Sequence, residues 1–319
     1  MEHCVFIGGC PRSGTTLLGS LLGAGPGCVT TPESQFLTKT AAKIARGELE
    51  NTPEAIRRAL ENNFRFTLWG VEAGDLSAGN PAASSPLAEL TRQAVEAYAA
   101  KTGRASWQTW IDHTPGHIKD IVLLQSLFPK AVFLHIIRDG RAAFASVKTL
   151  DWGPFGVIQG AQWWFHNVAA GLAAEQAFSP QVIRVHFESL VRNTSAELKR
   201  ICALLGLEYS EAMLAGDGFS VPAYTREQHA LVGQAPEPGV CDAWQQQLSN
   251  REVEIFESMT RPLLEYLGYR PHFGQRARSP NRREKCREVL QAGLRKAIAQ
   301  HRHRWWKRKQ GQGPAGSRP

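Results

Sequence analysis

The sequence lacks the features that mark membrane-spanning, zinc-binding and disulfide-bonded proteins. No apolar run approaches the roughly 18 residues of a membrane-spanning helix, and no basic, apolar leader follows Met1. The six cysteines are scattered and form no C-x-x-C pair or Cys/His cluster, which argues against a zinc site or a disulfide framework. From these absences we expect a protein of the reducing cytoplasm.

Charge is distributed unevenly along the 319 residues. Residues 275–319 hold fourteen Lys/Arg and two Asp/Glu, a net charge of +12; the whole chain carries +8, so residues 1–274 carry −4. We predict a folded domain over 1–274 and a basic C-terminal tail over 275–319, partly helical within 284–309 and disordered at its end. The tail favours peripheral contact with the anionic inner membrane surface or with an acidic polymer, and the alternative is a solubilising tail.

Strand-like and helical segments alternate along the chain, which predicts an α/β fold with a largely parallel sheet. Strands are expected at 4–7, 106–111, 131–137 and 182–187. Helices are expected at 15–23, 53–66, 86–102, 117–128, 141–150, 160–177, 196–205 and 250–267. Thr52, Ser85, Thr194 and Ser249 have the sequence context of helix caps, and 70–86 is typical of a surface loop.

Residues 4–16, CVFIGGCPRSGTT, carry the strongest functional signal. A buried strand runs into a Gly/Pro/Ser loop, and an apolar helix begins near Gly14. Backbone N–H groups and the helix dipole converge there, which is typical of an anion site. Arg12 adds a planar fork suited to oxyanions, and Thr15 and Thr16 add hydroxyl donors. We predict a loop that binds phosphate or a similar group; the alternative is a glycine-rich turn without a ligand.

The loop lacks the lysine of nucleoside triphosphatases. In Gly-x-x-x-x-Gly-Lys-Ser/Thr that lysine reaches the β- and γ-phosphates. Aligning Gly9 and Gly14 with the two glycines puts Thr15 at the lysine position. The chain therefore keeps a phosphate cradle without the ATPase lysine. A P-loop-like kinase or nucleotide phosphotransferase, which needs that lysine and magnesium, is the second enzymatic hypothesis.

A second basic segment follows the strand predicted at 131–137. Arg138 comes directly after this strand, and ligands gather at the carboxyl ends of parallel strands. If the two strands are neighbours, Arg138 lies beside the glycine-rich loop, and Ser146 in the next helix would share its anion. Two separated phosphate sites indicate a bisphosphate nucleotide. The alternative is that 138–141, Arg-Asp-Gly-Arg, forms a turn with self-paired charges.

Together these motifs resemble the PAPS-dependent sulfotransferase family. Pro11-Arg-Ser-Gly-Thr-Thr16 followed by Leu-Leu, and Phe128-Pro with Arg138-Asp-Gly-Arg and Ser146, are similar to its bacterial and tyrosylprotein branches. His186-Phe-Glu-Ser-Leu190 supports the resemblance, which covers about residues 3–272.

The resemblance implies a three-layer α/β fold with a mostly parallel central sheet and a P-loop-like 5′-phosphosulfate loop after the first strand. It implies PAPS (3′-phosphoadenosine 5′-phosphosulfate) as the donor and no metal. The phosphosulfate would bind Arg12, Ser13, Gly14, Thr15 and Thr16, and the 3′-phosphate would bind Arg138 and Ser146. Sulfuryl transfer to a hydroxyl would be an in-line displacement, assisted mainly by positioning and electrostatics.

The resemblance also implies which residues are catalytic besides Arg12. Related branches carry an acidic residue after the first helix, which assigns the general base to Glu33; the alternative is a surface or capping carboxylate. At position 113 relatives usually have a lysine that steadies the leaving phosphate. Here His113 would replace that lysine, act as an acid or base, or cap the next helix.

The acceptor is not evident from the sequence. A glycan, a tyrosyl peptide, a lipid head group or a small phenolic molecule would each supply a hydroxyl. We expect the loop-rich segments 34–110 and 209–245 to shape its pocket, and we expect no specific nucleic-acid partner. The non-enzymatic alternative is a binding module whose tail docks on nucleic acid or an anionic surface.

Overall fold

The computed structural model describes residues 3–77, 85–221, 233 and 237–293. The chain divides into two units by its internal contacts. The first unit comprises Met1–Arg138 and His166–Asp242, and the second comprises Asp139–Phe165 and Ala243–Pro319. Within the described ranges, no helix combines the length and the apolar character needed to cross a membrane.

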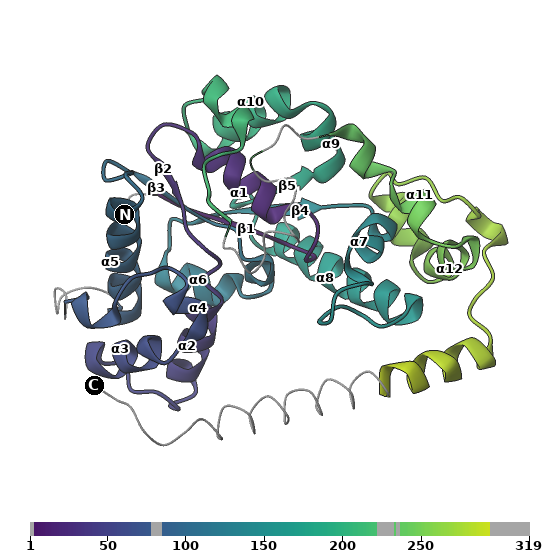
Figure 1. Cartoon of the computed structure of the whole chain (residues 1–319), viewed down its shortest axis with the longest axis horizontal. Helices are drawn as coiled ribbons and strands as arrows, with labels where there is room; N and C mark the ends of the chain where they lie inside the picture. The colour runs from purple at the N-terminus through teal and green to yellow at the C-terminus, as the bar shows by residue number, and fades with distance from the viewer. Residues whose placement is uncertain (1–2, 78–84, 222–232, 234–236, 294–319) are drawn as a thin grey trace, which may run out of the picture. The chain divides into compact units, whose positions relative to one another are not determined.

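The first unit is built on a parallel sheet (Figure 1). Its five strands, as far as the chain is described, are β1 (His3–Gly9), β2 (Cys28–Thr30), β3 (Thr109–Asp112), β4 (Val132–Ile137) and β5 (Val182–His186). They lie in the order β2-β3-β1-β4-β5, and all four pairings between neighbours are parallel. The predicted α/β class is confirmed.

Helices cover both faces of this sheet, because the strands are apolar on both sides. Val5 and Ile7 of β1 pack in one core with α1 (Thr15–Gly23), α9 (Phe187–Arg192) and α10 (Thr194–Leu205). Phe6 and Trp110 pack in a second core on the other face. Its helices are α2 (Gln35–Ala45), α3 (Pro53–Glu61), α4 (Phe64–Thr67), α5 (Pro86–Lys101) and α6 (Ile121–Leu127). Figure 1 shows these helices on either side of the sheet, so the three-layer prediction is confirmed.

Sequence patterns alone do not predict β2, α2 or α9. β2 has only three residues, and α2 begins without a side-chain cap. The helix predicted over 53–66 is two helices, α3 and α4. Asn63 separates them because its side chain accepts the N–H of Arg65 and starts a new helix.

The surface loop expected over 70–86 is confirmed only in part, since residues 70, 72, 74, 75 and 77 are exposed. Val71, Ala73 and Leu76 are buried in the second core, around the short 3-10 helix η1 (Ala73–Asp75). Residues 78–84 lie outside the described residues. The segment 34–110, expected to be loop-rich, contains α2 to α5 and forms a helical layer.

Three of the four predicted helix caps are confirmed. Thr52 accepts the N–H of residue 55, Ser85 accepts the N–H of residue 88, and Ser249 forms a capping box with Glu252. The cap at Thr194 is wrong, because α10 begins at Thr194 itself and no side chain caps that helix.

The second unit is helical where it is described. It contains α7 (Gly140–Val147), the first part of α8 (Val157–Ala177), α11 (Trp244–Gln247), α12 (Asn250–Tyr266) and a helix over 282–293. The guanidinium of Arg141 pairs with Asp139 at 2.7 Å and with Glu257 at 2.6 Å, and it stacks 4.2 Å from the Trp244 ring. In the turn 138–141, Asp139 therefore pairs with Arg141.

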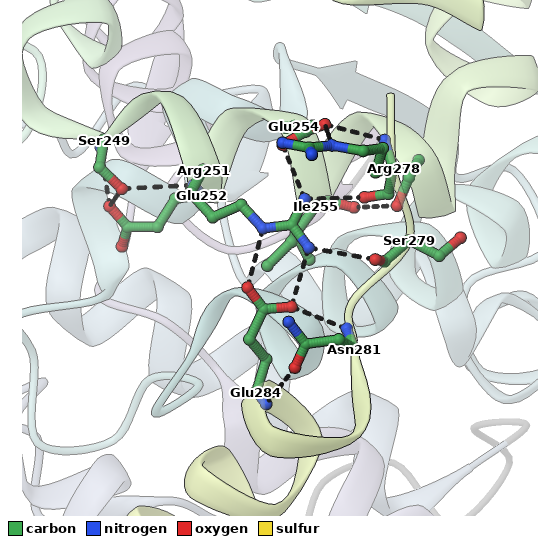
Figure 2. A network of polar contacts seen from close by, with 10 residues as sticks. Ser249, Arg251, Glu252, Glu254, Ile255, Arg278, Ser279, Asn281 and Glu284 are labelled. Atoms are coloured by element: carbon green, nitrogen blue, oxygen red, sulfur yellow. Dashed lines mark hydrogen bonds and ion pairs between the residues drawn. The ribbon is translucent and has the colours of Figure 1, made fainter. Parts of the chain in front are cut away.

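Ion pairs hold the chain after residue 274 on α12 (Figure 2). Arg251 pairs with Glu284 at 2.8 Å and with Glu254 at 2.7 Å, and Arg278 also pairs with Glu254 at 2.7 Å. Hydrogen bonds from these two arginines lower the pKa of Glu254 to about 2. The boundary expected at 274/275 stays a prediction, and the tail beyond 293 lies outside the described residues.

Candidate active site

The loop after β1 requires glycine at two positions. Gly9 ends β1, and a Cβ on it would lie 2.3 Å from the carbonyl oxygen of Ile136 in β4. Gly14 precedes α1 with φ of 96°, and a Cβ there would lie 2.5 Å from the ring of Phe187. The left-handed backbone and the close approach of neighbours exclude larger residues. The sequence motif therefore corresponds to a tightly packed loop.

Several polar side chains of this loop are buried, and the described residues do not satisfy all of their hydrogen-bonding groups. Ser13, Thr15 and Thr16 are buried, and Ser13 Oγ has no hydrogen-bond partner in the part of the chain that the structure describes. No side chain caps the N-terminus of α1. Arg12 and Gly14, both with positive φ, flank Ser13, an alternation that turns backbone N–H groups into one concave surface. The arrangement suits an anion with several oxygens.

Arg138 lies against this loop from the neighbouring strand. β1 and β4 pair directly, and Arg138 follows β4. Its Nη1 donates to the Arg12 carbonyl at 3.0 Å, and its Nη2 donates to the Val240 carbonyl at 3.1 Å. The guanidinium also stacks 4.4 Å from the Phe187 ring. The expected closeness of the loop and Arg138 is confirmed, whereas binding of a 3′-phosphate stays a prediction.

Two guanidinium groups are thus concentrated at the carboxyl edge of the sheet. Burial lowers the pKa of Arg12, and the nearby positive charge of Arg138 lowers it further. Like charges in a partly desolvated place destabilise the protein unless an anion compensates them. A strongly negative ligand bound at this edge of the sheet would therefore be stabilised by both guanidinium groups.

Ser146, predicted to share the 3′-phosphate with Arg138, belongs to a different unit. It lies in α7, one residue before the helix ends at Val147, in the unit that begins at Asp139. Its predicted role stays a prediction.

Glu33 lies at the same edge of the sheet, three residues after β2. β2 pairs with β3, and β3 pairs with β1, so the carboxyl ends of all three strands meet there. Glu33 is half-buried, and its Oε2 accepts a hydrogen bond from Gln35 Nε2 at 2.6 Å. The sequence correctly predicts its return to the sheet edge.

His113 directly follows β3 and is buried. Its ring lies 4.8 Å from the Phe219 ring and packs beside Gly19, and neither ring nitrogen has a hydrogen-bond partner among the described residues. Burial lowers the pKa of His113, and the negative charges of Glu33 and Asp112 oppose that shift only in part. A neutral imidazole cannot supply the permanent charge of a lysine.

The helix-capping alternative for His113 is wrong. The element that follows is the 3-10 helix η2 (Pro115–Lys119), whose N-cap is Thr114, and no side chain caps it. Ring nitrogens that no described residue engages, close to the negative charge of Glu33, instead suit hydrogen bonding or proton transfer to a ligand.

One cation near the loop is absent from the sequence motifs. Lys119 Nζ donates to Asn167 Oδ1 at 3.1 Å. Burial raises the pKa of the loop thiol Cys10 far above its ordinary value, and the charge of Lys119 opposes that shift. Lys119 lies in η2, six residues after His113. No known motif spacing predicts a cation at this position.

The described residues contain no group of three or more His, Cys, Asp or Glu side chains arranged to hold a metal ion. The charged groups at this edge are instead mainly cationic.

Comparisons with known proteins agree on one family. A family model described as "Sulfotransferase family" matches residues 4–211. Protein-tyrosine sulfotransferase A of Caenorhabditis elegans is 26% identical over 286 residues, which cover 84% of this chain and 67% of the relative. Nodulation protein NoeE of Sinorhizobium fredii is 26% identical over 349 residues, which cover 98% of this chain and 76% of the relative.

Solved structures have the same fold. The sulfotransferase domain of the Synechococcus PCC 7002 olefin synthase has a TM-score of 0.58 and 23% identity, covering 84% of this chain and 95% of that domain. The sulfotransferase domain of the curacin biosynthetic pathway has a TM-score of 0.56 and 15% identity, with coverages of 85% and 99%. At these identities the likeness shows the fold alone.

Proposed function

This chain belongs to the sulfotransferase family, and we propose that it transfers a sulfuryl group from PAPS to a hydroxyl acceptor. The observation that carries the proposal is the hydrogen bond between Arg138 Nη1 and the Arg12 carbonyl, 3.0 Å long. It joins the glycine-rich loop and the second basic segment at one edge of the sheet. A donor with an anionic group at each end fits this pair of segments.

Residues of the loop would bind the 5′-phosphosulfate. The fit rests on buried groups without a partner among the residues that the structure describes, above all Ser13 Oγ, and on the start of α1, which none of those residues caps. Backbone N–H groups of Gly14, Thr15 and Thr16 would add to them. Arg12 would neutralise charge on the moving group, and Arg138 would bind the 3′-phosphate.

The reaction is a displacement at sulfur. The acceptor oxygen forms a bond to sulfur as the bond between sulfur and the bridging oxygen breaks, and PAP leaves with the electron pair. Glu33 would take the proton of the acceptor hydroxyl, and the cationic edge of the sheet would stabilise charge on the leaving phosphate. His113, neutral in this environment, would donate a hydrogen bond to the reacting groups.

A tyrosyl hydroxyl is the first acceptor class to test. Several relatives are named as protein-tyrosine sulfotransferases, at identities of 24–26%. Glycans and small phenols also offer a hydroxyl. The helix over 282–293 exposes Val289 and Leu290 among basic residues, which supports the proposal that this end of the chain contacts an anionic surface. A cytoplasmic location stays a prediction.

The test is transfer of ³⁵S from labelled PAPS to separate panels of tyrosyl peptides, glycans and phenols, with EDTA present. We expect label in one panel and release of an equal amount of PAP. Magnesium-dependent transfer of phosphate from ATP, with no label transferred from PAPS, would support the kinase alternative instead.

A further inference from the structure

A buried polar network lies beside the proposed base. Ser34, the residue after Glu33, donates its backbone N–H to Thr114 Oγ1 at 2.9 Å. The Ser34 hydroxyl lies 2.9 Å from His117 Nε2, and the same nitrogen lies 3.6 Å from Asp112 Oδ2. The network therefore joins the segment after β2 to the end of β3 and to η2.

These groups depend on one another because they are excluded from water. Ser34, Asp112 and His117 are at most 1% exposed. Burial raises the pKa of Asp112, but the charge of His117 and hydrogen bonds from His117, Ser34 and Thr114 outweigh it and lower the pKa to about 2. A buried carboxylate that stays charged needs these partners, so removal of one perturbs the others.

The other side of Glu33 is held by β3 itself. Thr31 donates its N–H to the Ile111 carbonyl at 3.3 Å, and Thr31 Oγ1 accepts a hydrogen bond from Trp110 Nε1 at 2.9 Å. Hydrogen bonds at Thr31 and at Ser34 therefore fix the backbone on both sides of Glu33. Only rotation of its side chain is left to place the carboxylate.

His117 also connects this network to the strand that leads into the phosphate loop. Its ring packs edge-on against Phe6 of β1, with ring centroids 5.6 Å apart. The next residue, Ile118, packs on Gly8 so closely that a Cβ there would lie 2.7 Å from the Ile118 backbone nitrogen. η2 thus contacts both the segment that carries Glu33 and the strand before the loop.

We propose that His117 is a positioning residue, which acts through Ser34 and Asp112 to hold the Glu33 segment in register with the phosphate loop. The inference rests on the proposed function, because it takes Glu33 as the proton acceptor. A displacement of about 1 Å at a reacting group costs on the order of 10²-fold in rate. The network would therefore influence the rate although none of its side chains touches the substrate.

Three variants test the inference. His117→Ala removes the bond to Ser34, and His117→Gln keeps an amide nitrogen near the position of Nε2. His135→Ala is the matched control, since His135 is also fully buried on this sheet and pairs with a carboxylate, Glu175, at 2.6 Å. Two measurements apply to each: hydrogen–deuterium exchange of the peptide 28–36, and kcat and KM for ³⁵S transfer to a tyrosyl peptide or p-nitrophenol.

For His117→Ala we expect faster exchange in 28–36 and a fall in kcat of about 10- to 100-fold, with KM for PAPS changed by less than about threefold. His117→Gln should restore slow exchange and most of kcat. His135→Ala should lower the melting temperature but leave exchange in 28–36 slow and kcat near that of the wild type.

Unchanged exchange in His117→Ala would overturn the inference, because the segment would then be held by other contacts. Faster exchange with unchanged kcat would overturn the positioning role. Equal losses of kcat in His117→Ala and His135→Ala would indicate general destabilisation and also overturn it. A wild-type protein that transfers label to no acceptor would contradict the proposed function, and the exchange result would still decide whether the network holds the segment.

Discussion

Arg12 and Arg138 belong to segments more than a hundred residues apart, yet one hydrogen bond joins the backbone of the first to the side chain of the second. Both arginines could be predicted from sequence, because each follows a strand of a recognisable motif. The surroundings of His113 and His117 could not be predicted. They depend on the path of the chain after β3 and on η2, for which the sequence has no periodic pattern.

Replacing Glu33 with glutamine tests the proton acceptor. We expect Glu33→Gln to lower kcat by at least about 10²-fold, because general base catalysis contributes roughly 10² to 10⁴. PAP affinity, measured by calorimetry, should stay within about twofold, and Gln35→Ala should have a far smaller effect on rate. Near-normal turnover in Glu33→Gln would remove Glu33 as the base.

The pH dependence of the rate tests His113. Its pKa lies below the ordinary 6.5 because of burial, so it becomes charged only as the pH falls below that value. A charged imidazole would pair with Glu33 and weaken the base, so kcat/KM for PAPS should decline through that acidic range. In His113→Gln this decline should be lost. An identical profile in the variant, or a midpoint above 6.5, would contradict the assignment.

The strand, loop and helix over residues 3–23 are the part of the fold that the sequence predicts best. Helix bounds of 15–23 agree with the structure, since glycines, apolar spacing and the loop composition all act locally. β2 and α2 are set instead by pairing with β3 and by packing in the second core, which are contacts distant in sequence. For the same reason, Val71, Ala73 and Leu76 are buried although the composition of their segment is typical of a surface loop.

Alanine at Gly14 tests the packing of the loop. Both Gly14 and the control Gly47 have positive φ, at 96° and 71°, but only Gly14 has a neighbour within 4 Å of the added Cβ. We expect Gly47→Ala to cost about 1 kcal/mol of unfolding free energy, and Gly14→Ala to cost more and to abolish PAP binding. Equal PAP affinity in the two variants would show that the loop tolerates a side chain.

Across the whole chain, the sequence predicts a body and a basic tail, but the contacts that residues 278–288 make with other parts of the second unit are not visible in composition. The Glu288 carboxylate accepts the N–H groups of Ile158 and Gln159 at 3.1 and 2.7 Å and caps the start of α8. From the charge pattern alone, Glu288 would be assigned to a solvated tail, because that pattern carries no information on contacts with the start of α8.

Truncation distinguishes the two parts of this C-terminal region. A chain that ends at residue 293 should retain the melting temperature and the transfer rate of the full protein. A chain that ends at 274 loses the cap from Glu288, and we expect a loss of about 2 kcal/mol in unfolding free energy. Glu288→Ala should reproduce most of that loss. Equal melting temperatures for the two truncated chains would contradict this expectation.

The central claim is that one donor, anionic at both ends, binds across the Arg12 loop and Arg138. Calorimetric titration with PAP and with AMP, which lacks the 3′-phosphate, tests it directly when EDTA is present. We expect the wild type to prefer PAP by roughly 10- to 100-fold, the value of a charge-assisted hydrogen bond, and Arg138→Ala to lose most of that preference. Equal affinities of the wild type for PAP and AMP would contradict the account.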